Sequence, residues 1–244
     1  MKLERIAENI VKLYVATEDN PYIDQAFFQQ LKPIVEEINH DDKIAVVIMC
    51  GTLAYFSAGA SQDALQQTDT LPSCVIEIPE AILNIKVPTI ASMEGHGIGG
   101  GLILGLLCDM AMMAEESLYG ANFISMGFTP GMGSTQAVTD AFGPYIGRKM
   151  LFGGQLYKGQ EFKSFPGCTI EIMPKAEIAS ASLELAKNIA MNSRAALTLL
   201  KGKLSGRRLK NLKPVLDEEI KMHRFLFADP ETQKMINEHY LREL

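Results

Sequence analysis

Residues 93–101, which read MEGHGIGGG, decide the interpretation of this chain. The apolar run before them, 87–93 (VPTIASM), predicts a buried strand, and the run after them, 102–107 (LILGLL), predicts a buried helix. Glycines at such a strand-to-helix turn let the backbone approach a ligand closely and aim free amides at it, reinforced by the positive end of the helix dipole. We therefore expect this turn to bind and stabilise negative charge.

Two other interpretations of the glycine cluster are open. A dinucleotide-binding turn requires G-x-G-x-x-G, but Leu102 stands where the third glycine belongs, and the cluster lies in the middle of the chain. A tight packing turn without a ligand is the simpler alternative. A second element upstream, which matches the first in context, favours the ligand-binding interpretation.

The second element is residues 55–61, YFSAGAS. It follows the apolar run 44–49 (IAVVIM), which predicts a strand, and it precedes a short helical segment that begins near Ala60. Two glycine-containing loops, each after a buried strand, are thus available to build one site.

Together the two loops resemble the "F-x-A-G-A" and "G-x-x-G-G-G" motifs of the crotonase (enoyl-CoA hydratase/isomerase) superfamily. Residues 119–123 (YGANF) and 127–135 (GFTPGMGST) are similar to later active-site segments of the same superfamily, so the resemblance extends over nearly the whole chain. It implies that each of the first two loops offers one backbone amide to a thioester oxygen. Carried over by position, these catalytic donors are the amides of Ala58 and Gly100.

Composition and charge narrow the class of protein. The chain has 244 residues, 47% of them hydrophobic, and a formal net charge of −6, which argues against general nucleic-acid binding. It lacks both a long uncharged apolar run and an apolar signal core, so we expect a cytoplasmic protein without a membrane segment. Its scattered cysteines lack metal-ligand spacing, so no metal site is expected. The resemblance implies no cofactor beyond the phosphopantetheine or CoA that carries the substrate.

Strands and helices alternate in the first part of the chain, which predicts an α/β fold with a largely parallel sheet. Beyond residue 134 the pattern is mostly helical. The predicted strands are 10–16, 44–49, 87–93, 108–113 and 169–173, and the predicted helices are 23–39, 74–85 and 174–191. The resemblance implies a crotonase-type ββα spiral core over 1–192, then a helical C-terminal region, 193–244, that covers the active site and forms a homotrimer or hexamer.

The side chains near the two predicted donor amides, those of Ala58 and Gly100, select the reaction. In hydratases of the superfamily two glutamates hold and activate a water, and the matching positions here are Ile103 and Phe123. Hydration is therefore not expected. Decarboxylation needs no base to begin, and it is favoured when a carboxylate moves from water into dry, apolar surroundings while the enolate is stabilised elsewhere. Ile103 and Phe123 would supply that dry wall against the substrate.

At a finer level the chain resembles the decarboxylating crotonases of polyketide β-branching cassettes. The resemblance implies conversion of a 3-methylglutaconyl to a 3-methylcrotonyl group on an acyl-carrier protein. One departure is that residues 61–66 contain neither the tyrosine nor the lysine that members can carry there. Two alternatives stay open: an isomerase or hydrolase of acyl-CoA, and a catalytically silent fold that binds the carrier protein.

Three polar side chains are further candidates for the site. Gln62 could donate a hydrogen bond to the substrate carboxylate, and His96 could contact the acyl chain or bond only to nearby backbone. His223 lies in a predicted helix that, by resemblance, covers the acyl pocket. Because histidine titrates near neutral pH, we expect His223 to protonate the dienolate as an imidazolium, the alternative being an exposed helix residue.

A locally basic segment, 201–213, stands out in this acidic chain. Carrier proteins are acidic and their prosthetic arm carries a phosphate, so complementary charge on this segment would speed their encounter. The alternative is an ordinary solvated helix face.

Overall fold

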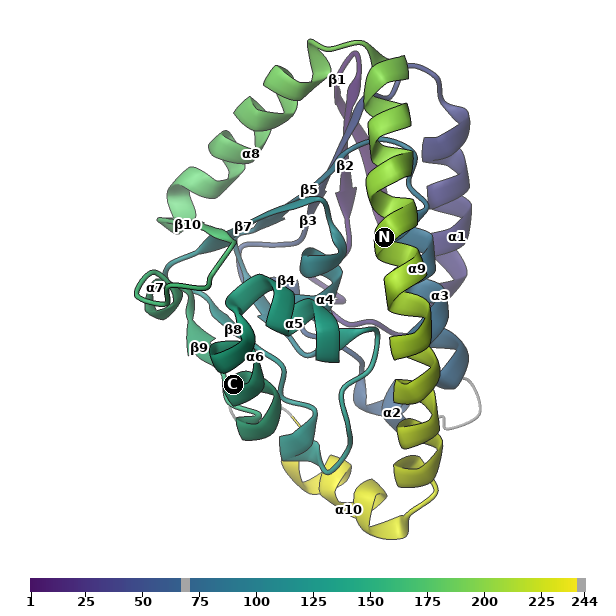
Figure 1. The fold of residues 1–244 in the computed structure, drawn as a ribbon, viewed down its shortest axis with the longest axis vertical. Coiled ribbons are helices and arrows are strands. Elements are labelled where there is room, and N and C mark those ends of the chain that lie inside the picture. Colours follow the sequence, from purple (N-terminus) through teal and green to yellow (C-terminus); the bar gives the residue numbers. More distant parts are fainter. Residues whose placement is uncertain (67–70, 241–244) are drawn as a thin grey trace.

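The computed structural model describes residues 1–66 and 71–240 as a two-sheet α/β fold with helices around it (Figure 1). The larger sheet has six strands in the order β1-β2-β3-β5-β7-β10, antiparallel between β1 and β2 and parallel elsewhere. Its strands are β1 (Lys2–Ala7), β2 (Ile10–Tyr14), β3 (Val46–Cys50), β5 (Thr89–Met93), β7 (Met110–Ala114) and β10 (Glu171–Met173).

The smaller sheet has four short strands in the order β4-β6-β8-β9. They are β4 (Tyr55–Ser57), β6 (His96–Ile98), β8 (Leu118–Gly120) and β9 (Tyr157–Lys158). Three successive strands of the large sheet, β3, β5 and β7, are each followed by a strand of the small sheet. This repeated step is the ββα spiral, so the predicted crotonase-type core is confirmed.

Helices cover both faces of the larger sheet, which explains why β3 is apolar throughout. Along β3, Val46 and Ile48 belong to the cluster beneath α8 (Lys175–Ala190), while Val47 and Met49 belong to the main core on the opposite face. That second face is covered by helices α1 (Gln25–His40), α3 (Leu71–Leu83) and α4 (Gly100–Leu107).

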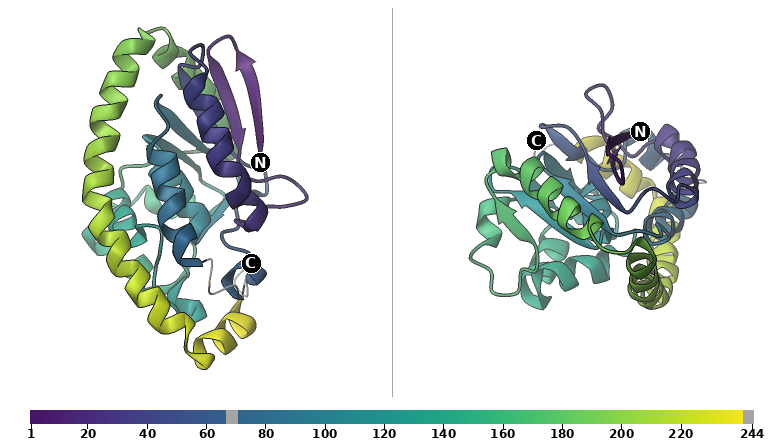
Figure 2. Two further views of the ribbon diagram at one scale, coloured as in Figure 1. Left: turned by 90° about the vertical axis from the view of Figure 1, so that its right-hand side faces the viewer. Right: turned by 90° about the horizontal axis from the view of Figure 1, so that it is seen from above.

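The long helix α9 (Arg194–Phe227) runs along the whole side of the molecule (Figure 2, left). Lys201 anchors its first half, because its buried ammonium group contacts Asp109 at 2.7 Å. The short helix α10 (Pro230–His239) then turns back across the lower end (Figure 1). The remaining helices are α2 (Gln62–Gln66), η1 (Ile124–Met126), α5 (Ser134–Phe142), α6 (Pro144–Gly153) and α7 (Gly159–Phe162).

Each predicted strand of the large sheet and each predicted helix has a counterpart within a few residues. The small sheet was not predicted, and neither was β1. Helix α9 begins at Arg194, beside the predicted boundary after residue 192. The assignment of 193–244 to trimer contacts and active-site cover stays a prediction.

The basic segment 201–213 is partly built into the fold. Besides the buried Lys201, Arg208 donates hydrogen bonds of 2.8–3.1 Å to the carbonyls of Leu106, Leu107 and Cys108 at the end of α4. A cation there satisfies orphan carbonyls and complements the helix dipole. Arg208 is therefore a structural cap, and a docking surface on this segment would consist of its exposed cations, Lys203, Arg207, Lys210 and Lys213.

Two absences hold for residues 1–66 and 71–240. None of the helices there is long and apolar enough to cross a membrane. No group of three or more His, Cys, Asp or Glu side chains in that part of the chain could hold a metal ion.

The Arg208 cap predicts a stability difference between two adjacent arginines. Arg208→Met should lower the free energy of unfolding by about 2 kcal/mol, because three carbonyl hydrogen bonds to a charged donor are lost. The exposed Arg207→Met is the matched control and should change it by less than about 0.5 kcal/mol. Urea unfolding followed by circular dichroism measures both, and equal effects would contradict the capping role.

Candidate active site

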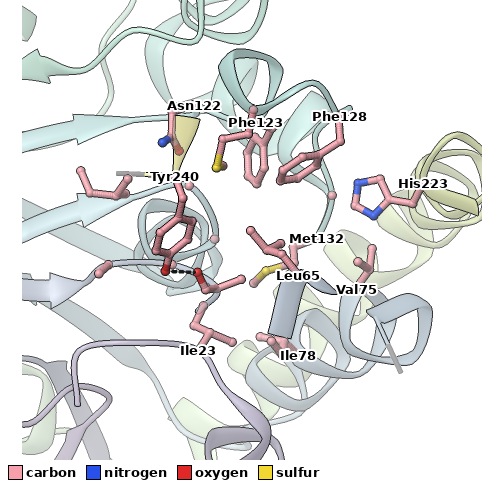
Figure 3. A pocket seen from close by; sticks show the side chains of 18 of the residues that line it. Ile23, Leu65, Val75, Ile78, Asn122, Phe123, Phe128, Met132, His223 and Tyr240 are labelled. Carbon is pink, nitrogen blue, oxygen red and sulfur yellow. Dashed lines mark hydrogen bonds between the residues drawn. The ribbon is translucent and has the colours of Figure 1, made fainter. Parts of the chain in front are cut away.

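A largely apolar cavity lies where α4 begins (Figure 3). It is bounded by the loop after β4 (residues 58–61, the β4 loop), by the 122–132 segment and by helices α3 and α9. Its apolar walls include Ile23, Leu65, Ile78, Phe123, Met126, Phe128 and Met132. Within the part of the chain that the structure describes, no Asp, Glu, Lys or Arg lines it. The polar side chains that reach it are Asn122, His223 and Tyr240.

Two glycines bring the two predicted loops into contact at this cavity. A Cβ atom on Gly59 would lie 2.6 Å from the Ile98 carbonyl oxygen, and one on Gly101 would lie 2.1 Å from the Ser57 carbonyl oxygen. Gly59 also has φ of +78°, a conformation that disfavours other residues. The sequence therefore places glycine where only glycine allows the β4 loop to touch the start of α4.

Gly100 supplies one free amide. It is the first residue of α4, so its N–H has no carbonyl within the helix to bond to, and it lies at the positive end of the helix dipole. Gly100 also lines the cavity. Its predicted position as an oxyanion donor matches this geometry.

The second free amide at the cavity is that of Ala60 and not that of Ala58. Although Ala58 lines the cavity, its amide already donates to the Pro21 carbonyl at 2.9 Å. The positive φ of Gly59 turns the chain between the two alanines, so Ala60 points its amide in a new direction.

The backbone pairing of Ala60 fixes that direction. Ala60 forms a parallel bridge with Ile23, and the bridge uses the Gly59 carbonyl and the Ser61 amide. In such a bridge the N–H and C=O of the middle residue point away from the partner strand. The Ala60 amide thus faces the cavity, and it has no backbone acceptor among the described residues.

Three residues expected to contact substrate lie outside the cavity lining. His96 accepts a hydrogen bond from the Leu118 amide at Nδ1 (2.8 Å), so it joins two strands of the small sheet. Ile103 is fully buried in the main core. Gln62 donates to the Asn237 side chain at 3.1 Å instead of pointing at a substrate.

Phe123 does line the cavity, as the prediction of an apolar wall requires. Its ring meets Phe128 edge-on at 6.0 Å between centroids. The adjacent Asn122 is 6% exposed, and its Oδ1 is buried with no hydrogen-bond partner in the described structure. Buried polar atoms are nearly always paired, so Asn122 Oδ1 is available to accept a hydrogen bond from a ligand.

His223 lies at the end of the cavity opposite Asn122 (Figure 3). It is 4% exposed, and its Nε2 lies 2.7 Å from the Thr129 carbonyl oxygen. A carbonyl only accepts, so Nε2 carries the proton and Nδ1, which has no partner in the described chain, carries the lone pair. Burial lowers the pKa of His223. The ring is therefore neutral at pH 7 in this structure, whereas the sequence led us to expect an imidazolium.

Glu219, which sequence analysis missed, lies one helical turn before His223 on α9. Its buried carboxylate accepts hydrogen bonds from the Gly133 amide at 2.6 Å and from the amide and hydroxyl of Thr135 at 3.0 and 2.7 Å. Burial nevertheless raises the pKa of Glu219. Glu219 and His223 thus hold the 129–135 loop against α9. In the sequence, a charged residue among the apolar positions of a predicted helix could have indicated Glu219.

Tyr240 is the second site residue that was missed, since nothing local marks a tyrosine just after a terminal helix. Its hydroxyl donates to the Ala60 carbonyl at 2.9 Å (dashed in Figure 3). The C-terminal end of the described chain therefore contacts the β4 loop, which is the first oxyanion loop.

This arrangement can stabilise a developing anion. Two preorganised amides and a helix N-terminus converge on one side of an apolar cavity, which is the geometry that favours an enolate formed from a thioester. A neutral imidazole faces the same cavity and can exchange a proton.

Comparison with known proteins agrees with this geometry. The profile of the enoyl-CoA hydratase/isomerase family matches residues 8–241. The chain belongs to this family. The resemblance to the crotonase superfamily is therefore confirmed.

Two relatives represent two activities of the family. The bacillaene synthase decarboxylase PksI of Bacillus subtilis is 32% identical over 232 residues, which cover 94% of this chain and 92% of the relative. The 2,3-dehydroadipyl-CoA hydratase of Escherichia coli is 26% identical over 88% of this chain and 85% of the relative.

Solved structures extend the similarity to the decarboxylating branch. A structure from a dehydratase/decarboxylase couple of polyketide β-branching superposes with a TM-score of 0.89 at 29% identity, covering 99% of both chains. The ECH2 decarboxylase domain of CurF from Lyngbya majuscula gives 0.86 at 26% identity, covering 98% of both. The finer resemblance to β-branching decarboxylases is thus confirmed.

The contacts of Glu219 predict that its charge holds the 129–135 loop. Glu219→Gln should lower the free energy of unfolding by about 2 kcal/mol, because one acceptor oxygen becomes a donor facing another donor. The exposed neighbour Glu218, whose side chain is 70% exposed, supplies the control variant Glu218→Gln. Denaturant unfolding that finds the two variants alike would refute this role of Glu219.

Proposed function

We propose that this protein decarboxylates a 3-methylglutaconyl-type thioester, carried on an acyl-carrier protein, to a 3-methylcrotonyl-type thioester. The observation that carries the proposal is a cavity with two free backbone amides and no lining carboxylate among the described residues. Similarity to decarboxylases, including one from a polyketide β-branching couple, supports the reaction and the substrate class.

The bond between the substrate carboxylate and its carbon breaks first. Its electron pair passes through the conjugated system to the thioester oxygen, where the amides of Ala60 and Gly100 stabilise the dienolate. The carboxylate leaves as carbon dioxide, which depends less on hydration than the anion does. An apolar wall that includes Phe123 and Phe128 therefore favours the transition state over the bound carboxylate.

The proton that completes the product comes from His223. Burial favours the neutral ring, but a bound carboxylate near Nδ1 would raise the pKa of His223 and favour uptake of a proton. After carbon dioxide departs, the Nδ1 proton passes to carbon. The balance is one carboxylate and one proton consumed for one carbon dioxide and one C–H bond formed.

A second candidate function rests on the same lone pair. A neutral His223 with a free Nδ1 can also act as a base, as an acyl-CoA isomerase would require. Hydration lacks its two carboxylates, because Phe123 occupies one of the expected positions at the cavity and Ile103, at the other, is buried in the core.

Turnover of defined thioesters tests the proposed function. We expect a 3-methylglutaconyl thioester to release carbon dioxide, and crotonyl thioester to yield no hydroxyacyl product. Mass spectrometry of the acyl group, on pantetheine and on a carrier protein, measures both. A double-bond shift without loss of carbon dioxide would establish the isomerase, and no reaction of any of the thioesters would support a silent binding protein.

The role of His223 predicts a particular pH dependence. Burial lowers the pKa of His223 from its ordinary value, so kcat/KM, which reports the free enzyme, should fall as pH rises toward 7. His223→Gln keeps an amide that can donate to Thr129 but has no transferable proton, so kcat should fall at least about 100-fold and lose that dependence. Steady-state rates between pH 5 and 8 check this, and a variant with the wild-type profile would exclude His223 as the donor.

A further inference from the structure

The first oxyanion loop is held by the far end of the chain. Asn237 on α10 accepts hydrogen bonds from Gln62 at 3.1 Å and from Gln66 at 2.7 Å, and Tyr240 donates to the Ala60 carbonyl at 2.9 Å. These contacts join segments about 175 residues apart, as their sequence separations of 171 to 180 show. Tyr240 also lines the cavity itself (Figure 3).

The Ala60 carbonyl would repel a negatively charged oxygen bound at the Ala60 amide. Because Ala60 pairs with Ile23 through its neighbours, its N–H and C=O point to the same side. Without a partner, the carbonyl oxygen would present a negative dipole close to the amide that receives the enolate. A hydroxyl donated to that carbonyl opposes the repulsion and also fixes the orientation of the residue.

We infer that Tyr240 is a positioning residue for the oxyanion hole, which orients the Ala60 amide by holding the Ala60 carbonyl. The inference rests on the proposed function only in assuming that a thioester oxygen occupies the hole. Packing alone would need the ring of Tyr240 and not its hydroxyl. Burial raises the pKa of Tyr240 well above its ordinary value, so the hydroxyl stays a proton donor throughout the physiological range.

The test separates the hydroxyl from the ring. Tyr240→Phe should lower kcat for decarboxylation by about tenfold, because a misplaced donor loses transition-state stabilisation, while KM stays within about twofold. A second readout is the infrared carbonyl stretch of bound 3-methylcrotonyl pantetheine thioester, labelled with ¹³C at C1. Binding to Tyr240→Phe should shift this frequency from its solution value by less than binding to the wild type does. Tyr145→Phe, at a tyrosine 78% exposed on α6, is the matched control and should change neither quantity.

The outcomes distinguish this inference from the proposed function. Unchanged kcat and carbonyl frequency in folded Tyr240→Phe would overturn the inference, and so would a rise in KM alone, which would mean that Tyr240 only closes the cavity. A second variant, Asn237→Ala, breaks the α10–α2 contact but keeps the hydroxyl. Asn237→Ala should leave the carbonyl frequency shift unchanged. If it reduces that shift as much as Tyr240→Phe does, the effect comes from the packing of α10 against α2 and not from the Tyr240 hydroxyl. If the wild type releases no carbon dioxide while the carbonyl shift still depends on the hydroxyl, the proposed function fails and the positioning role stands.

Discussion

The structure depends on a backbone contact closer than any side chain would permit. Where the β4 loop meets α4, the space for a Cβ at Gly101 is already taken by the Ser57 carbonyl, and that at Gly59 by the Ile98 carbonyl. This approach brings the Ala60 amide to the cavity that the Gly100 amide faces from the start of α4. Dipoles fixed in this way need no reorganisation when charge develops, because folding has already oriented them.

Helix α9 joins that rigid centre to His223, the proposed proton donor. Its buried Lys201 contacts Asp109, and its partly buried Arg208 contacts the end of α4. Its Glu219 and His223 hold the 129–135 loop. Each polar contact lies on the stripe that faces the core, where an unpaired charge would be expensive. Register along this helix is therefore set by polar pairing as well as by apolar packing, and a shift of α9 would misplace His223.

The large sheet and its helices could be predicted because long apolar runs carry a strong signal. The strands of the small sheet have two or three residues and contain glycine, so no periodic pattern marks them. Motif position assigned the first oxyanion donor to Ala58, whereas the Ala58 amide is bonded to Pro21 and the free amide follows the left-handed turn at Gly59, on Ala60. Contacts across the whole chain, such as that of Tyr240, leave no local trace in a single sequence.

The cavity is polar at its two ends and apolar between them. Asn122 and His223 each keep a buried atom without a partner in the described structure, and an unmade hydrogen bond of this kind costs about 1–3 kcal/mol. A ligand carboxylate recovers part of that energy at His223 once Nδ1 has taken up a proton and donates it, whereas a simple acyl chain offers no such partner. Among the described residues no Asp, Glu, Lys or Arg lines the wall, so selectivity for a thioester that carries a carboxylate can arise from His223 while the rest of the wall stays apolar enough for the carboxylate to leave.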